Sequence, residues 1–164
     1  MKLPAITFNQ QALSRFDEAI EKEWLITNGL GGYASSTVLG INTRKYHGLL
    51  VAALNPPGNR TVCLSKLDED VSVGSNVYQL GANEFHNAIY PQGYSYLKEF
   101  SISPFPTYTY KVPDFTVNKT IFMPKDLAAQ IEVTAEGVGI ITYKMSIFSS
   151  RRIFFSGLVA GKET

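Results

Sequence analysis

From Tyr46 onward the chain is a succession of short apolar segments separated by glycine, proline, asparagine and aspartate, and this punctuation limits its fold most strongly. The clearest turn is Asn55-Pro56-Pro57-Gly58-Asn59, because proline fixes φ and glycine permits left-handed backbone. Residues 141–147 alternate between apolar and polar side chains, which is the period of a strand with one exposed face. Short strands at regular spacing indicate an antiparallel, mainly β domain, such as a sandwich or a large sheet.

The same signals divide the rest of the chain. The 60–73 segment is expected to break at the acidic run Asp68-Glu69-Asp70, and a hairpin is expected around Glu136-Gly137. The aromatic stretch 81–96 is expected to be irregular, and the last residues are expected to fray. The segments expected to form strands are 46–54, 60–73, 77–80, 96–102, 107–112, 115–122, 130–134, 140–147 and a stretch near 153–159.

Residues 10–21 are the segment with a helical period. Leu13, Phe16 and Ile20 recur at spacings of three and four, charged residues fall on other faces, and Asn9 is placed to cap the first turn. The period then changes to two. The sequence therefore predicts a mainly β protein with one short N-terminal helix.

Length and charge narrow the function classes. The 164 residues are enough for one domain with a core, 1–164, and short for two. The net charge of +1 gives no electrostatic basis for binding nucleic acid or an anionic membrane. One cysteine, Cys63, excludes an internal disulfide, and no segment has the length of a membrane span or the pattern of a signal peptide. A cytoplasmic location is expected.

The stretch 23–54 mixes glycines, tyrosines, small hydroxyl residues, an arginine and a histidine, a mixture that a core strand does not need. Gly29, Gly31 and Ala34 match the spacing of a dinucleotide fingerprint, but that motif requires a following helix and an acidic residue about 20 positions later. Here Ser35-Ser36-Thr37 favours strand or loop, and no carboxylate follows at that distance. Nucleotide binding is excluded, and the glycines are interpreted as a tight loop.

The group Arg44, Tyr46 and His47 is the strongest candidate for ligand contact. A guanidinium supplies five donors, and tyrosine and histidine supply flat faces with polar tips, which suit sugar rings and hydroxyls. The alternative is that Arg44 pairs with a local carboxylate while the other two residues pack. The two histidines, His47 and His86, have no close partners of ligand type, so no metal site is expected.

The acidic run and the aromatic residues each allow two interpretations. Adjacent acids on a strand point to opposite faces, so Asp68-Glu69-Asp70 fits a solvated, charge-protected strand edge better than a catalytic pair. The aromatic side chains could form a platform for stacking sugars, although such residues also commonly fill strand cores, and Tyr90 and Tyr94 are the best candidates for exposure. The aromatic residues considered are Phe85, Tyr90, Tyr94, Tyr96, Phe100, Phe105, Tyr108 and Tyr110.

One long ordered block carries a family resemblance. It comprises Glu23-Trp24-Leu25, Asn28-Gly29-Leu30-Gly31-Gly32-Tyr33-Ala34-Ser35, Thr37, Gly40, Asn42-Thr43-Arg44 and Tyr46-His47-Gly48-Leu49-Leu50-Val51-Ala52. Further pieces follow in order, among them Leu64-Ser65-Lys66-Leu67, Tyr78-Gln79-Leu80, Tyr90-Pro91 and Tyr96-Leu97. In residues 23–124 the chain resembles the N-terminal domain of bacterial and archaeal glycogen debranching enzymes, which are amylo-α-1,6-glucosidases. The tail 149–164 departs from the family pattern.

The resemblance implies an antiparallel β-supersandwich that precedes an (α/α)6 barrel carrying the catalytic carboxylates. This chain has no room for that barrel, so a non-catalytic domain without cofactor or metal is expected, with the barrel in cis or in trans and glycogen or an α-glucan oligosaccharide as partners. A stand-alone carbohydrate-binding module and a partner subunit for a separately encoded barrel are the alternatives. The residues expected to contact substrate or barrel are Asn28, Gly29, Tyr33, Ser35, Thr37, Arg44, Tyr46 and His47.

Overall fold

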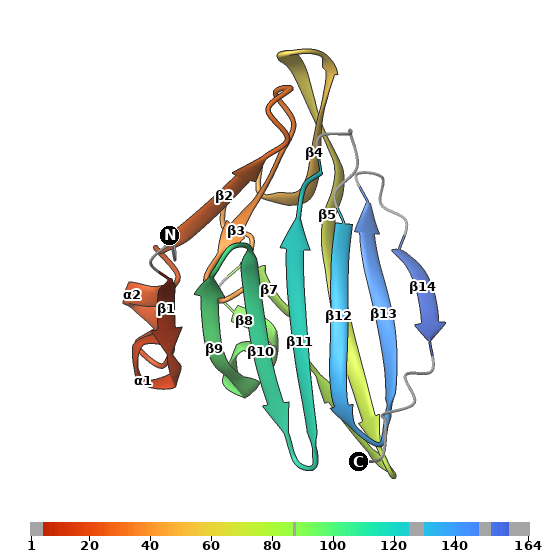
Figure 1. Cartoon of the computed structure of the whole chain (residues 1–164). Coiled ribbons are helices and arrows are strands. Elements are labelled where there is room, and N and C mark those ends of the chain that lie inside the picture. Colours follow the sequence, from red (N-terminus) through yellow and green to blue (C-terminus); the bar gives the residue numbers. More distant parts are fainter. Residues whose placement is uncertain (1–4, 87, 125–129, 148–151, 158–164) are drawn as a thin grey trace.

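Two antiparallel sheets and a separate two-stranded hairpin make up the computed structural model, which describes residues 5–86, 88–124, 130–147 and 152–157 (Figure 1). The mainly β prediction is confirmed. In spatial order, the first sheet contains β1 (Ile6–Asn9), β9 (Leu97–Ile102), β10 (Pro106–Val112), β11 (Phe115–Phe122) and β12 (Gln130–Gly137). The second contains β14 (Arg152–Gly157), β13 (Ile140–Ile147), β5 (Gly58–Val73), β4 (Gly48–Asn55), β3 (Tyr33–Thr37) and β2 (Glu23–Thr27).

Strand β5 is the centre of the second sheet. Its first half pairs with β4, and its second half pairs with β13 and with the short β6 (Asn76–Gln79). The strand runs without interruption through Asp68-Glu69-Asp70, so both the predicted break and the predicted solvated edge are wrong. Each acid has a lysine partner: Lys66 for Asp68, Lys119 for Glu69 and Lys144 for Asp70. These ion pairs allow a charged run to occupy an interior strand.

The predicted hairpin around Glu136-Gly137 is also wrong. Strand β12 pairs with β11 in the first sheet, whereas β13 pairs with β5 in the second. The chain therefore crosses from one sheet to the other at this turn, where Gly137 has φ of +125°. An added Cβ at Gly137 would lie 2.4 Å from the carbonyl oxygen of Asp114, so a side chain has no room here.

Two further expectations need correction. The stretch 81–96 is regular: β7 (Ala82–Phe85) and β8 (Ala88–Gln92) form a hairpin, and the 3-10 helix η1 (Gly93–Tyr96) follows.

The single helix is instead two short helices, α1 (Gln10–Leu13) and α2 (Phe16–Ala19). The cap is as predicted, because the Asn9 side chain accepts a hydrogen bond from Ala12 N at 3.0 Å. Strand β14 lies within one residue of the expected start, while residues 158–164 lie outside the described parts of the chain.

Aromatic and aliphatic side chains fill the space between the sheets. Phe100 and Ile121 from the first sheet and Val71 and Ile141 from the second are fully buried. Tyr108 joins the layers, because its hydroxyl accepts from Trp24 Nε1 and donates to the carbonyl of Thr37, each at 2.6 Å. In the described segments, no helix is long and apolar enough to cross a bilayer.

Candidate functional site

A surface pocket of about 280 Å³ lies against the β2–β3 hairpin and the loop that leads into β4. Side chains of opposite character meet there: an arginine, a glutamate, a histidine and two tyrosines. Its lining brings together five of the residues singled out from the sequence, with three that were not. The lining residues are Glu23, Trp24, Leu25, Tyr33, Ser35, Arg44, Tyr46 and His47.

The other predicted site residues lie outside this pocket. The Asn28 side-chain oxygen accepts from Leu30 N at 2.9 Å and Gly32 N at 3.1 Å, which holds the β2–β3 turn together. Gly29 adopts φ of +76° in that turn. Thr37 is fully buried, and its hydroxyl bonds to both backbone groups of Ile41. These residues shape the loops rather than line the pocket.

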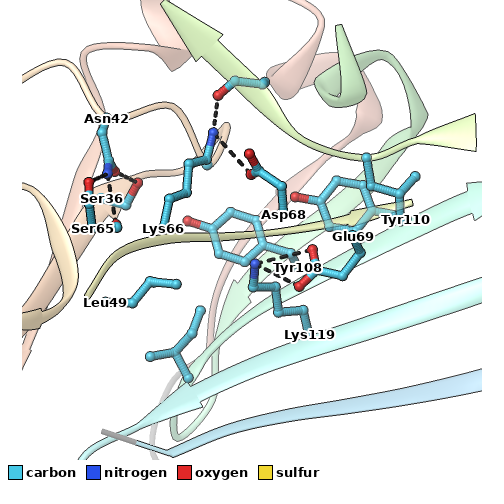
Figure 2. A pocket seen from close by; sticks show the side chains of 14 residues that line it. Ser36, Asn42, Leu49, Ser65, Lys66, Asp68, Glu69, Tyr108, Tyr110 and Lys119 are labelled. Atoms are coloured by element: carbon cyan, nitrogen blue, oxygen red, sulfur yellow. Dashed lines mark hydrogen bonds and ion pairs between the residues drawn. The ribbon is translucent and has the colours of Figure 1, made fainter. Parts of the chain in front are cut away.

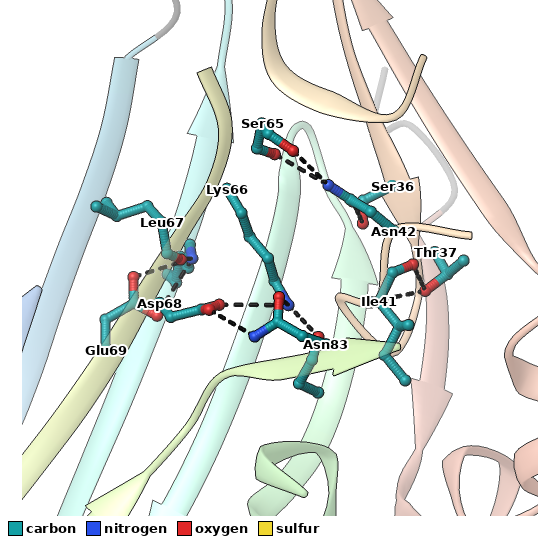
Figure 3. A network of polar contacts seen from close by, with 12 residues as sticks. Ser36, Thr37, Ile41, Asn42, Ser65, Lys66, Leu67, Asp68, Glu69 and Asn83 are labelled. Atoms are coloured by element: carbon teal, nitrogen blue, oxygen red, sulfur yellow. Dashed lines mark hydrogen bonds and ion pairs between the residues drawn. The ribbon is translucent and has the colours of Figure 1, made fainter. Parts of the chain in front are cut away.

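Asn42 attaches the loop that carries Arg44 and His47 to the sheet. Its side-chain amide donates to Ser65 O in β5 at 3.0 Å, and its side-chain oxygen accepts from the Ser36 hydroxyl in β3 at 2.8 Å, as Figure 3 shows. Two strands of one sheet thus fix the start of the loop. The positions of the pocket's polar side chains therefore follow from the sheet, and a loop fixed by a rigid scaffold is a common carrier of binding residues.

Glu23 is the electrostatic centre of the pocket. Its Oε1 lies 2.5 Å from Arg44 Nε and 3.6 Å from His47 Nε2. His47 Nδ1 accepts from Thr43 N at 3.2 Å, so the neutral ring carries its proton on Nε2 and faces the carboxylate. Burial lowers the pKa of His47, and Glu23 opposes that shift without reversing it. At neutral pH the imidazole is uncharged.

The two tyrosines supply flat apolar faces. Tyr33 donates its hydroxyl to Tyr46 O at 3.1 Å, and burial raises the pKa of Tyr33. The Tyr46 side chain is 53% exposed, with the Lys45 ammonium 5.6 Å from the centre of its ring. Arg44 pairs with a carboxylate and His47 is buried, as the packing alternative expected, but Tyr46 does not pack into the core. An exposed ring beside a guanidinium and a carboxylate is suited to hydrogen bonding and stacking with a sugar.

A comparison with protein families shows to which family the chain belongs. The glycogen debranching enzyme N-terminal family matches residues 22–152. The chain belongs to this family. The match extends beyond residues 23–124 into the tail that departs from the pattern quoted above. The comparisons with curated proteins and with solved structures gave no match.

Glu23, Trp24 and Leu25 belong to the pocket of this debranching-enzyme domain, yet were not among the predicted site residues. The signal that would have found them is the pairing of two adjacent strands. The β2–β3 register places Leu25 opposite Ser35 and Thr27 opposite Tyr33, so alternate residues of β2 lie beside predicted site residues of β3. Leu25 is 62% exposed on this strand and adds apolar surface to the pocket.

A second polar cluster of the domain lies inside the sandwich and is structural. Lys66, Asp68, Glu69 and Lys119 surround an interior space of about 20 Å³, together with Tyr108 and other residues (Figure 2). A volume of that size has room for about one water molecule and none for a substrate. In the part of the chain that the structure describes, no cluster of histidine, cysteine and carboxylate side chains is arranged to hold a metal ion.

Proposed function

We propose that this chain is the non-catalytic N-terminal β-sandwich domain of a glycogen debranching enzyme, an amylo-α-1,6-glucosidase. In this proposal the β2–β3 pocket faces the catalytic (α/α)6 barrel and contributes to the binding of an α-glucan. The observation that carries it is the family match together with the convergence of Tyr33, Arg44, Tyr46 and His47 on one pocket. A cytoplasmic location goes with this proposal, because it places the domain with its polymer substrate.

The chemistry of the pocket supports a binding role rather than a hydrolytic one. Glycoside hydrolysis uses two carboxyl groups separated by roughly 5 to 10 Å. Glu23 is the one carboxylate in the pocket lining, and Arg44 already holds it at 2.5 Å. The remaining guanidinium nitrogens of Arg44 and the tyrosine hydroxyls are left as partners for sugar hydroxyls. Catalysis would therefore be supplied by the barrel.

The location of the pocket supports contact with a second protein surface. Strand β2 is the last strand of its sheet in the described part of the chain, so one side of its backbone is free to pair or to be covered. Leu25 and Tyr46 expose apolar surface beside it, at 62% and 53%. Apolar exposure next to a sheet edge is typical of a surface that packs against a partner.

Kinetics of the debranching enzyme that carries this domain test the proposal. Arg44→Ala and Tyr46→Ala should each raise KM for branched limit dextrin by about 10-fold, the value of one charged hydrogen bond or one stacked ring. Arg15→Ala is the matched control, since it removes an exposed arginine from a different ion pair, the one with Glu18. Unchanged KM and kcat in both pocket variants would exclude a role in substrate binding.

The same pocket also fits two other arrangements. The exposed Leu25 and Tyr46 favour a partner subunit for a separately encoded barrel, which co-purification of the two chains would detect. A stand-alone carbohydrate-binding module would instead bind maltoheptaose without any barrel, which titration calorimetry of the 164-residue chain measures directly. The chain alone should release no glucose from limit dextrin in any of these arrangements.

A further inference from the structure

A second pocket, of about 120 Å³, lies where the β7–β8 hairpin meets β5, β6 and β13. It shares no lining residue with the β2–β3 pocket. Carboxylates, amides, a lysine and two aromatic rings converge there. The lining residues are Asp68, Asp70, Gln79, Gly81, Asn83, Phe85, Tyr90, Pro91 and Lys144.

The aromatic part of this pocket comes from one face of the hairpin. The register pairs Asn83 with Tyr90, and Phe85 lies two residues from Asn83, so the three side chains share a face. Tyr90 is 65% exposed and Phe85 is 49% exposed, and neither belongs to the core. The Tyr90 hydroxyl is 3.5 Å from Gln79 Oε1, which directs the ring toward the β6 side of the pocket. Two exposed rings on one face provide apolar surface for a ligand.

The polar part of the pocket carries balanced charge. Asp68 pairs with Lys66 at 3.3 Å and Asp70 pairs with Lys144. Asn83 donates to Asp68 at 3.0 Å and accepts from Lys66 at 3.2 Å, an arrangement visible in Figure 3. Because each carboxylate has its own ammonium, the pocket favours neither an anion nor a cation. Its donors and acceptors are suited to a neutral ligand rich in hydroxyl groups.

The pocket is also held rigidly. Leu80 N donates to Glu69 O at 2.8 Å, Gly93 N donates to Gly81 O at 2.9 Å, and Lys66 donates to Ala82 O. The first and third of these bonds attach the start of the hairpin to the central strand β5, and the second attaches the end of the hairpin to its start. A ligand therefore meets groups that are already in position, and little ordering of the hairpin opposes binding.

We propose that this pocket is a second carbohydrate site, which takes one neutral pyranose ring. The apolar face of the sugar lies against Tyr90 and Phe85, and its hydroxyls bond to Asp70, Gln79 and Lys144. The volume of about 120 Å³ limits the pocket to part of one ring and leaves no room for a chain. The ligand class follows from the pocket itself, whereas the choice of an α-linked glucose unit rests on the proposed function. Two sites on one domain would hold a branched glucan more tightly than either site alone.

The test is a titration of the isotope-labelled 164-residue chain with maltose, followed by backbone amide chemical shifts. Maltose at millimolar concentration should shift the amides of Asn83, Phe85 and Tyr90, because a single-ring site binds weakly. Tyr90→Ala should abolish these shifts, whereas Tyr90→Phe, which keeps the ring, should retain them. Phe85→Ala should weaken binding by about 10-fold, in line with the loss of one stacking ring. Because both rings are exposed, neither substitution should unfold the domain, and thermal unfolding of each variant checks this.

The outcomes separate the two proposals. Shifts confined to amides near Tyr46 and His47 would overturn the second site and leave the β2–β3 pocket standing. Shifts confined to the β7–β8 hairpin would support the second site and count against sugar contact in the other pocket. Absence of shifts at the hairpin, or shifts that survive Tyr90→Ala, would overturn the second site. Equal shifts with the β-linked disaccharide cellobiose would overturn the α-glucan assignment.

Discussion

Lys119 of β11 and Glu69 of β5 form an ion pair between the two sheets, with Nζ 2.9 Å from Oε1 and 3.2 Å from Oε2. Their side chains are 8% and 2% exposed. Burial raises the pKa of the Glu69 carboxyl, and the ammonium of Lys119 opposes this shift. Each charge is therefore tolerated inside the sandwich because the other is present.

Removal of one partner should be far more damaging than removal of both. Lys119→Met leaves a buried carboxylate without its cation and should lower the free energy of unfolding by about 3–5 kcal/mol. The double variant Lys119→Met, Glu69→Leu should recover most of this loss, since a buried pair gains little over apolar residues of similar size. Urea denaturation measures both values. A single variant that loses less than about 1 kcal/mol would mean that water reaches the pair.

This ion pair also shows what the sequence could and could not predict. Strand β11 was predicted with its observed bounds, because Phe115 to Phe122 alternates and has turn residues before it. The same alternation puts Lys119 on the face of Val117 and Ile121, but nothing in its own strand names a partner for the charge, and Asp68-Glu69-Asp70 looks like a solvated edge. Lys119 and Glu69 lie 50 residues apart in the chain, so only the packing of one sheet on the other brings these two charges together.

Contacts between residues far apart in the sequence also explain why the sheet assignment of β12 and β13, and part of the pocket, could not be predicted. A glycine turn between two strands has one local pattern whether the second strand folds back or crosses to another sheet, and the deciding partner of β13 is the distant β5. Arg44, Tyr46 and His47 could be identified from residue type. Their neighbour Glu23 could not, because its place beside them depends on the pairing of β2 with β3.

Tyr108 provides a test of the contacts between the sheets. Tyr108→Phe removes the hydroxyl that accepts from Trp24 Nε1, and the buried indole donor loses its partner. Thr37 O keeps a second donor, Gly40 N at 3.0 Å, so the main loss is at Trp24. We expect a destabilisation of about 1–3 kcal/mol in thermal or urea unfolding. Tyr110→Phe is the control, since its hydroxyl is outside this chain of bonds, and an equal loss in both variants would contradict the assignment.

Gly93 tests how closely the end of the β7–β8 hairpin must approach residues 80–81, which lead into it. An added Cβ would lie 2.0 Å from Leu80 O and 2.5 Å from Gly81 O, both backbone atoms that cannot rotate away. Gly93→Ala should therefore lower the free energy of unfolding by about 1–3 kcal/mol or more. Gly58→Ala is the matched control, because its nearest neighbour, Asn55 O, would be at an ordinary 3.5 Å. Similar unfolding midpoints for the two variants would show that the hairpin shifts without cost.

His47 should make the stability of the domain depend on pH. Burial holds its pKa in the folded protein below the ordinary value near 6.5, so between these two values the unfolded chain binds more protons. Stability is then fully present above about pH 6.5 and is lost as the pH falls toward the folded pKa. Each unit of pKa difference corresponds to about 1.4 kcal/mol, which urea unfolding midpoints measured from pH 7.5 down to about pH 5 can follow.

Two variants identify the group responsible for this pH dependence. His47→Asn keeps an acceptor for Thr43 N but removes the titrating ring, so its stability should lack this loss between neutral and mildly acidic pH. Glu23→Gln removes the carboxylate that opposes the shift, so the pKa of His47 should fall further and the loss in acid should increase. A profile that stays the same in His47→Asn would assign the pH dependence to other groups. A smaller loss of stability in acid for Glu23→Gln would contradict this account, because it would mean that Glu23 does not stabilise the protonated ring of His47.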